Sequence, residues 1–265
     1  MLFSCAAAKA RAEFFINPAA PEAYELFTIE FIGLNTDANL LSNPFVDILE
    51  GRINIEYRSL NVDFGVPSGT NTSTTIQGLP HGEYSLGFVQ RFENGELATK
   101  AENIAIRISE APPTQTAHTF FHPGIKHYFL TAEEYERDLV IRNGWHSTDP
   151  GFKVWPANGP AAKAAKPVCR FYSTLVNSHF FTASNNECQY LQSFDSGWSY
   201  EGIAFRALVP VNGACLAGTT PVWRLFNNRF AQLDSNHRFV ASVDTYRNMI
   251  SAGWKGEGVA FCSPI

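Results

Sequence analysis

The stretch from His179-Phe180-Phe181 to Gly197-Trp198 and on to Phe205 has a counterpart on each side of it. The counterparts are His127-Tyr128-Phe129 to Gly144-Trp145 to Phe152, and His237-Arg238-Phe239 to Gly253-Trp254 to Phe261. Successive Trp residues of the pattern are 53 and 56 residues apart. A period near 50 is typical of repeat architectures, in which one copy is too small to bury its own core. The sequence therefore predicts a domain of three copies that pack on one another.

The first, second and third copies occupy residues 118–156, 167–210 and 221–265, and together they form a predicted repeat domain over 118–265. Within each copy the expected order is strand, strand, helix, Gly-Trp, strand. We expect the three copies to form a pseudo-threefold arrangement that could be trefoil-like. The predicted fold class is mainly β.

Helix-capping residues recur at one place in each copy. Thr131, Ser184 and Ser242 stand where the helices should begin, because a hydroxyl side chain can accept a hydrogen bond from the first turn. Glu134 and Glu187, three residues after the first two, would complete capping boxes. The Gly of each Gly-Trp pair is expected to end its helix.

Residues 14–110 alternate between apolar and polar residues in the manner of strands. The expected strands are Tyr24–Ile32, Phe45–Leu49, Ile53–Tyr57, Tyr84–Val89 and Ile104–Ile108. Several short strands separated by turn signals predict an immunoglobulin-like β-sandwich. Residues 111–117, with two consecutive prolines, form a predicted linker to the repeat domain. Residues 1–13 are interpreted as the remnant of an export signal or as a disordered arm.

Composition excludes several classes of partner. Hydrophobic residues make up 45% of the chain and charged residues 17%, as in a globular protein with an aromatic core. A net charge of −5 leaves no surplus of Lys and Arg to bind phosphates, so no nucleic acid is expected as a partner. The chain has no run of eighteen apolar residues, so it is not expected to span a membrane.

Three groups of residues in the second copy carry a resemblance to a known family. They are Val168-Cys169-Arg170-Phe171-Tyr172, His179-Phe180-Phe181-Thr182 and Gly197-Trp198 continuing to Tyr200-Glu201-Gly202-Ile203-Ala204-Phe205. The pattern resembles the repeat of secreted bacterial domains of unknown function, which occur alone or attached to extracellular hydrolases. The third copy keeps it, whereas the first has Thr119 in place of the Arg and Thr148-Asp149 in place of Glu-Gly. The resemblance covers residues 118–265 and implies no catalytic residue.

The histidine that recurs once per copy admits two interpretations. If His127, His179 and His237 all point toward one axis, three imidazoles could bind zinc and leave a fourth position open. The stronger interpretation is that each His lies in an aromatic strand as part of the core and forms local hydrogen bonds. On that interpretation the chain has no metal site and no cofactor.

Arg170 with Glu201, and Arg224 with Glu257, occur together in the second and third copies and are both missing from the first. Joint presence and joint absence indicate contact, most simply a structural ion pair. A planar guanidinium with several N–H donors, beside a carboxylate and an aromatic face, is also suited to binding a sugar. The candidate ligand-binding residues are Arg170, Tyr172, Glu201, Trp223, Arg224 and Glu257.

Four of the five cysteines lie in the repeat domain and allow three pairings. Cys169 and Cys188 are replaced together by large rings, by Trp223 and Tyr246 in the third copy and by His118 and Tyr135 in the first. The joint replacement predicts a Cys169–Cys188 disulfide. Cys215 and Cys262 would then pair and hold the end of the chain, as in proteins of an oxidising compartment.

The sequence carries no nucleophile elbow, phosphate loop or zinc-protease motif. We therefore expect a non-catalytic extracellular binding module, secreted, periplasmic or at the cell surface, with a polysaccharide or another cell-surface component as partner. Two alternatives stay open. One is an accessory domain or degenerate form of a secreted envelope hydrolase, and the other is a structural adhesion protein.

Overall fold

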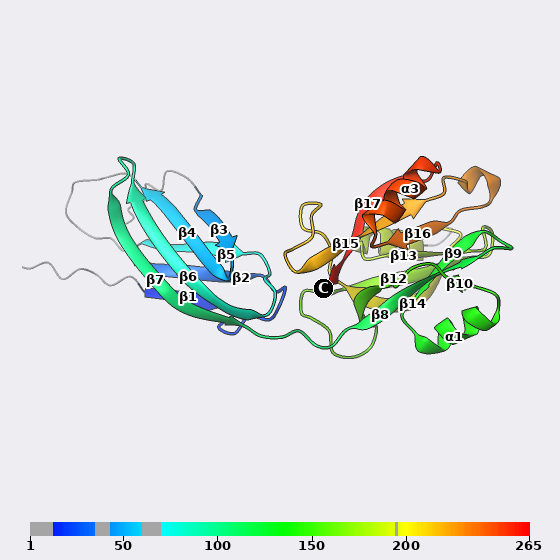
Figure 1. Ribbon diagram of the computed structural model, residues 1–265, viewed down its shortest axis with the longest axis horizontal. Helices are drawn as coiled ribbons and strands as arrows, with labels where there is room; N and C mark the ends of the chain where they lie inside the picture. Colours follow the sequence, from blue (N-terminus) through cyan, green and yellow to red (C-terminus); the bar gives the residue numbers. More distant parts are fainter. Residues whose placement is uncertain (1–12, 35–42, 60–69, 194–195) are drawn as a thin grey trace, which may run out of the picture. The chain divides into compact units, whose positions relative to one another are not determined.

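The computed structural model describes residues 13–34, 43–59, 70–193 and 196–265 (Figure 1). The chain divides into two compact units, residues 1–110 and 111–265, and both are mainly β. Within the described ranges, no helix has the length and apolar character needed to cross a membrane. Of the predicted export remnant 1–13, only Glu13 is described, at the start of the first strand; the rest lies outside the described residues.

The first unit consists of two sheets. One sheet has the order β1-β2-β5 and the other the order β3-β4-β6-β7. The strands are β1 (Glu13–Asn17), β2 (Phe27–Leu34), β3 (Phe45–Leu49), β4 (Arg52–Ser59), β5 (Thr70–Ile76), β6 (Gly82–Phe92) and β7 (Leu97–Ile108). Phe31 on β2 contacts Tyr57 on β4 and Phe88 on β6, with ring centroids 5.7 and 4.3 Å apart, so these rings join the two sheets.

Two features of the first unit differ from the expected sandwich. β4 and β6 pair in parallel, whereas an immunoglobulin domain has antiparallel sheets. β1 and β5 were not expected from the sequence. β5 reads Thr-Asn-Thr-Ser-Thr-Thr-Ile, so its strand preference comes from β-branched Thr and not from an apolar alternation.

The second unit repeats one order of elements three times, with an additional short strand in the first copy. The first copy contains β8 (Gln115–His122), β9 (His127–Thr131), α1 (Glu134–Arg142), β10 (His146–Ser147) and β11 (Phe152–Pro156). The second contains β12 (Lys166–Ser173), β13 (Ser178–Thr182), α2 (Asn185–Gln192) and β14 (Ser199–Ala207). The third contains β15 (Thr219–Phe226), the 3-10 helix η1 (Phe230–Gln232), β16 (His237–Val240), α3 (Val243–Ser251) and β17 (Lys255–Pro264). β8 begins inside the predicted linker, and β15 begins two residues before the predicted third copy.

One apolar core is shared by the three copies. Each copy contributes a Phe from its last strand, and Phe205 lies within 6.3 Å of Phe152 and 5.6 Å of Phe261, ring centroid to centroid. Further residues come in sets of three from matching strands. These sets are Ala117, Val168 and Val222, and Leu130, Phe181 and Phe239. Because every set has a member in each copy, the copies bury their apolar faces against one another.

The Gly-Trp residues lie outside this shared core. Trp198 packs on Phe180 beside the Cys169–Cys188 bridge, and Trp254 belongs to a separate cluster around Leu225. All three Trp side chains of the pattern are half-buried. Trp198 therefore covers a smaller apolar cluster of its own copy, whereas the cluster of Trp254 also includes Tyr128 of the first copy.

The hairpin register corrects the expected alignment of the first copy. Tyr128 takes the hairpin position that His179 and His237 take in the later copies, and His127 comes one residue earlier. A shift of one residue turns a strand side chain to the opposite face of its sheet. The three histidines therefore do not meet, and the described residues include no group of three His, Cys, Asp or Glu side chains placed to hold a metal ion.

Two of the three helix starts are as expected. Ser184 and Ser242 are N-caps whose hydroxyls accept a backbone N–H of the first turn. The N-cap of α1 is Glu133, two residues after Thr131, and its side chain forms no capping bond. The Thr131 hydroxyl instead accepts the N–H of Glu133, so the capping box expected in the first copy is not formed. The box expected in the second copy is formed only in part, because the N–H of Ser184 donates to Thr182 and the carboxylate of Glu187 binds Arg224.

Both predicted disulfides are confirmed. The Cα atoms of Cys169 and Cys188 are 6.0 Å apart, and those of Cys215 and Cys262 are 5.6 Å apart. In the third copy Trp223 packs against Tyr246 with ring centroids 5.5 Å apart, as the joint replacement implied.

The first copy differs from that expectation. Counted from the N-caps, Arg137 and not Tyr135 corresponds to Cys188. The charge of Arg137 acts on His118, whereas the residue Tyr135 is 75% exposed. The sequence alignment of α1 was therefore wrong by two residues.

Candidate functional site

A group of charged residues joins the first copy to the second. Arg170 on β12 donates from Nη1 to both carboxylate oxygens of Glu136 on α1, at 2.9 and 2.8 Å. Its Nε contacts Glu201 on β14 at 2.9 Å. His179 lies 3.3 Å from the same Glu201 oxygen, and Thr131 donates to Glu136 at 2.6 Å. Nη2 of Arg170 takes part in none of these contacts.

The same group recurs between the second and third copies. Arg224 on β15 donates to both oxygens of Glu187 on α2 at 3.1 Å each, and from Nε to Glu257 on β17 at 2.8 Å. His237 lies 3.4 Å from Glu257, and Thr182 donates to Glu187. Each Arg therefore connects a carboxylate of its own copy with one on the helix of the preceding copy.

Burial and pairing set the protonation of these groups. Burial acts to raise the pKa of Glu187, but hydrogen bonds from Arg224 and Thr182 hold it below its usual value. Burial also acts to raise the pKa of Glu257, but His237 and Arg224 lower this pKa below its usual value. Burial, helped by the charge of Arg170, lowers the pKa of His179 to about 4. At neutral pH both carboxylates are ionised and His179 is uncharged.

Between the third copy and the first, a different set of contacts takes this place. Thr119 stands where the other copies have Arg, and its hydroxyl contacts that of Thr148 at 3.1 Å. A guanidinium comes instead from the third copy. The Arg238 guanidinium carbon lies 4.4 Å from the centre of the Tyr128 ring, and its Nη2 lies 3.9 Å from Asp149.

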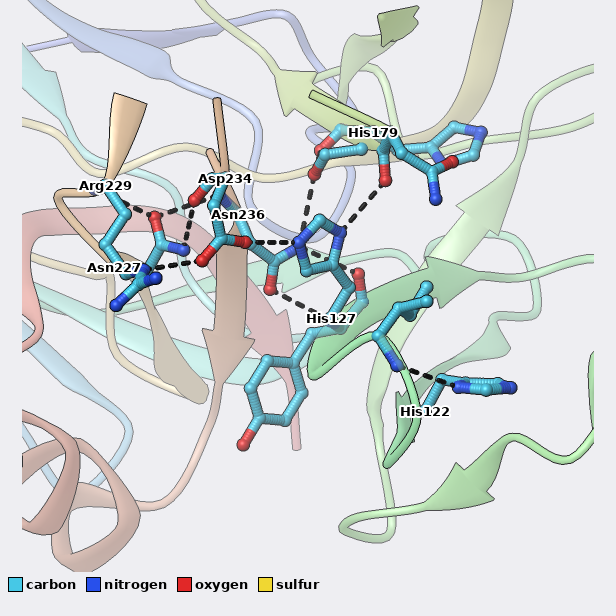
Figure 2. A network of polar contacts seen from close by, with 11 residues as sticks. His122, His127, His179, Asn227, Arg229, Asp234 and Asn236 are labelled. Atoms are coloured by element: carbon cyan, nitrogen blue, oxygen red, sulfur yellow. Dashed lines mark hydrogen bonds and ion pairs between the residues drawn. The ribbon is translucent and has the colours of Figure 1, made fainter. Parts of the chain in front are cut away.

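His127 lies at the centre of a second polar network, in which all three copies take part (Figure 2). Its Nδ1 is 2.9 Å from the backbone oxygen of Asn177, and its Nε2 is 2.7 Å from the carboxylate of Asp234. Asn236 donates to the Ser178 hydroxyl at 3.1 Å. His127, Ser178 and Asn236 are all buried and occupy matching positions one residue before the second strand's His or Tyr.

An Asp-His pair resembles half of a catalytic triad, because the carboxylate orients the imidazole. Here the second ring nitrogen of His127 faces the carbonyl oxygen of Asn177 and not a nucleophilic hydroxyl. Burial acts to raise the pKa of Asp234, but hydrogen bonds from His127 and Arg229 hold this pKa below its usual value. The arrangement holds three copies together and does not activate a nucleophile.

Two pockets lie at the boundaries between copies. One of about 360 Å³ lies beside Arg224, Glu187 and Glu257, with apolar walls from residues such as Val209 and Pro210. The other, of about 170 Å³, lies between the first and second copies. Its walls are largely aromatic and include Trp145 and Tyr172.

The structure brings together part of each predicted ligand-binding set. Arg170 and Glu201 are in contact, and Tyr172, two residues along the strand from Arg170, packs against His179 at 4.8 Å between ring centroids. Arg224 and Glu257 are also in contact. Trp223 precedes Arg224 directly and packs in the apolar cluster with Tyr246, apart from the charged group.

Sequence reasoning missed the helix carboxylates Glu136 and Glu187 and the loop carboxylate of Asp234. The first two had a signal, since each follows a strand-ending Thr by five residues: Thr131 and Thr182. Asp234 lies in a loop that only the third copy has, so no comparison between copies could indicate its role.

Residues 116–264 match the family described as a domain of unknown function (DUF5648). No curated protein and no solved structure matches the chain.

Proposed function

Since the chain belongs to this family, whose function is unknown, we propose from the geometry that it is an extracellular, non-catalytic binding protein with polysaccharide as its ligand. The observation that carries the proposal is the charged group at two copy boundaries. At the second boundary Arg224, Glu187 and Glu257 line a pocket directly, and at the first the group reaches a pocket through His179, which contacts Glu201. The group presents fixed N–H donors and carboxylate acceptors side by side. Such pairs suit the adjacent hydroxyl groups of a sugar, each of which donates and accepts a hydrogen bond.

Extracellular location is part of the proposal. Two disulfides persist in oxidising compartments and are rare in the cytosol. We also propose that the second unit is a pseudo-threefold repeat domain, trefoil-like in having three equivalent copies around one core, and that the first unit is an immunoglobulin-like sandwich modified by its parallel strand pair. A first unit of that kind would serve as a spacer.

A structural adhesion role is the second candidate, and one observation favours it. Every nitrogen of the Arg224 guanidinium already contacts a carboxylate of the protein. An ion pair of this kind can serve packing between copies without any ligand.

The test separates the two roles. The full chain is applied to an array of bacterial and plant polysaccharides and to cell-wall fractions, beside an Arg170→Lys, Arg224→Lys double variant. Lys keeps the positive charge but loses the planar fork, so we expect binding by the natural chain and at least tenfold weaker binding by the variant. An Arg206→Lys, Arg247→Lys variant is the control. Binding by none of the polysaccharides would leave the structural role.

A further inference from the structure

The smaller pocket is built by both of its neighbouring copies. The first copy contributes residues that include Tyr128 and Trp145, and the second contributes Tyr172, Asn177 and His179. The Tyr172 hydroxyl donates to the Asn177 side chain at 2.8 Å, which fixes both side chains at the pocket wall. The first copy, although it lacks the Arg and the Glu of the pattern, therefore supplies half of this site.

The size and walls of this pocket suit one sugar ring. Its volume of about 170 Å³ is below the ~300 Å³ at which pockets for drug-sized molecules begin. The rings of Tyr128, Trp145 and Tyr172 are half-buried, so each keeps part of its surface accessible. An aromatic face packs against the apolar C–H face of a pyranose, and nearby polar groups bind its hydroxyls. Asn177 and the uncharged His179 provide such groups.

The charges around the pocket favour an uncharged sugar. Arg170, whose charge acts on His179 at the pocket wall, is already paired with Glu136 and Glu201 and has no excess positive charge for an anionic ligand. Among the described residues that line the pocket there is no Asp, Glu, Lys or Arg. A carboxylate or an ammonium group of a sugar would therefore lose its hydration without gaining a partner.

The corresponding histidine is more deeply buried at the second boundary. His237, in the position of His179, packs on Phe226 and Phe180 at 4.9 Å between ring centroids, much as His179 packs on Tyr172 and Phe129 at 4.8 and 4.9 Å. Its side chain is 9% exposed, against 25% for His179. At the third boundary the Arg238 guanidinium covers the Tyr128 ring.

We infer that the pocket between the first and second copies is a subsite for one uncharged pyranose unit, with Trp145 and Tyr172 as its stacking faces. The inference rests on the proposed polysaccharide binding and narrows it, at this boundary, to one pocket and one ligand charge.

The experiment follows the five Trp indole N–H signals of the full chain in a two-dimensional ¹⁵N NMR spectrum. The probes are the methyl glycosides of glucose, galactose and mannose, together with N-acetylglucosamine, glucuronate and glucosamine. A Trp145→Phe variant identifies the Trp145 signal. Tyr172→Leu removes one stacking face, and Tyr190→Leu is the matched control, since Tyr190 is 73% exposed on α2 and outside the pocket.

We expect at least one uncharged sugar to shift the Trp145 signal to saturation with a Kd on the order of 1 mM, as for a small ligand. Glucuronate and glucosamine should bind at least tenfold more weakly. Tyr172→Leu should weaken binding at least tenfold, and Tyr190→Leu less than twofold.

Three outcomes would overturn the inference while leaving polysaccharide binding in place. They are shifts at other Trp signals with Trp145 unchanged, unaltered affinity in Tyr172→Leu, and binding on the polysaccharide array without any response to the monosaccharide probes. Equal binding of glucuronate would overturn the charge preference. The proposed function itself falls if the array shows no binding.

Discussion

At the scale of single residues, Arg170 and Arg224 show that a sequence pattern can predict one partner of an ion pair and miss another. Arg224 and Glu257 vary together between copies, and they do touch. Glu187, the other carboxylate on Arg224, comes from a helix of another copy. The spacing of five residues from Thr182, shared with Thr131 and Glu136 in the first copy, marks Glu187 as a recurring position. It does not say that Arg224 is its partner, because the pairing depends on how one copy packs on the next.

Removing the guanidinium of Arg224 should leave two half-buried carboxylates unpaired. Breaking a buried pair costs ~3–5 kcal/mol, and because Glu187 is 40% exposed we expect about 2 kcal/mol for Arg224→Ala. Denaturant unfolding measures the change. Arg247→Ala, on the exposed surface of α3, is the control and should change the unfolding free energy by less than about 0.5 kcal/mol. Equal effects of the two substitutions would contradict the ion-pair account.

The pKa of His179 gives a direct check on the burial of the first boundary. Because burial and Arg170 favour the neutral ring, its ¹H NMR titration should have a midpoint near pH 4. The pKa of His179 is lower in the folded protein than the value of 6.5 in the unfolded chain, so the unfolded chain takes up the proton first as the pH falls. The contribution of the neutral ring to the free energy of unfolding is therefore fully present above pH 6.5 and is lost as the pH falls toward 4. The signal is identified by its loss in His179→Gln. A midpoint at or above 6.5 would show that the ring is solvated.

At the scale of elements, hairpins and helices were predictable from the sequence more readily than their alignment between copies. The strand and helix order of the second and third copies followed from Ser184, Ser242 and the Gly-Trp pairs. The first copy was misaligned by one residue at His127 and by two at Tyr135. A histidine and a tyrosine both occur in apolar strands, so residue type alone could not decide which one corresponds to His179.

The helix caps offer a comparison within one molecule. Ser184→Ala and Ser242→Ala should each cost about 1 kcal/mol of unfolding free energy, because each removes an acceptor for a first-turn N–H. Glu133→Ala should cost less, since Glu133 forms no side-chain cap, and Glu133→Ser should be stabilising by up to about 1 kcal/mol. Thermal unfolding measures all four. A loss of stability in Glu133→Ser would mean that its charge matters more than the missing cap.

At the scale of the whole molecule, the shared core decides how the second unit unfolds. Phe205 from the second copy contacts rings from the first and the third, so no copy keeps its core when another is lost. This could be predicted from the period of the pattern, because a copy of some 50 residues cannot bury enough surface alone. The network around His127 could not, since the three equivalent positions hold His127, Ser178 and Asn236, which share no residue type.

Replacing Phe205 with Ala should cost about 3–5 kcal/mol through the cavity that it leaves. Because the core is common, we expect the amides of all three copies to lose hydrogen-exchange protection together in this variant. Leu175→Ala, at an exposed hairpin turn of the same copy, is the control. Loss of protection confined to residues 167–210 would show that the copies are independent units.

The two ends of the second unit lie beside the same short piece of β11. Gln115, near its start, pairs with Val154, and the Ser263 hydroxyl near its end accepts the N–H of Lys153. The start is also held by Trp155, whose indole donates to the Pro112 carbonyl at 2.8 Å. A unit whose ends leave side by side can be circularly permuted. We expect a chain that joins residue 265 to residue 111 through a short glycine linker, and opens at the exposed Asn212-Gly213 turn, to fold with the same disulfides, which mass mapping would verify.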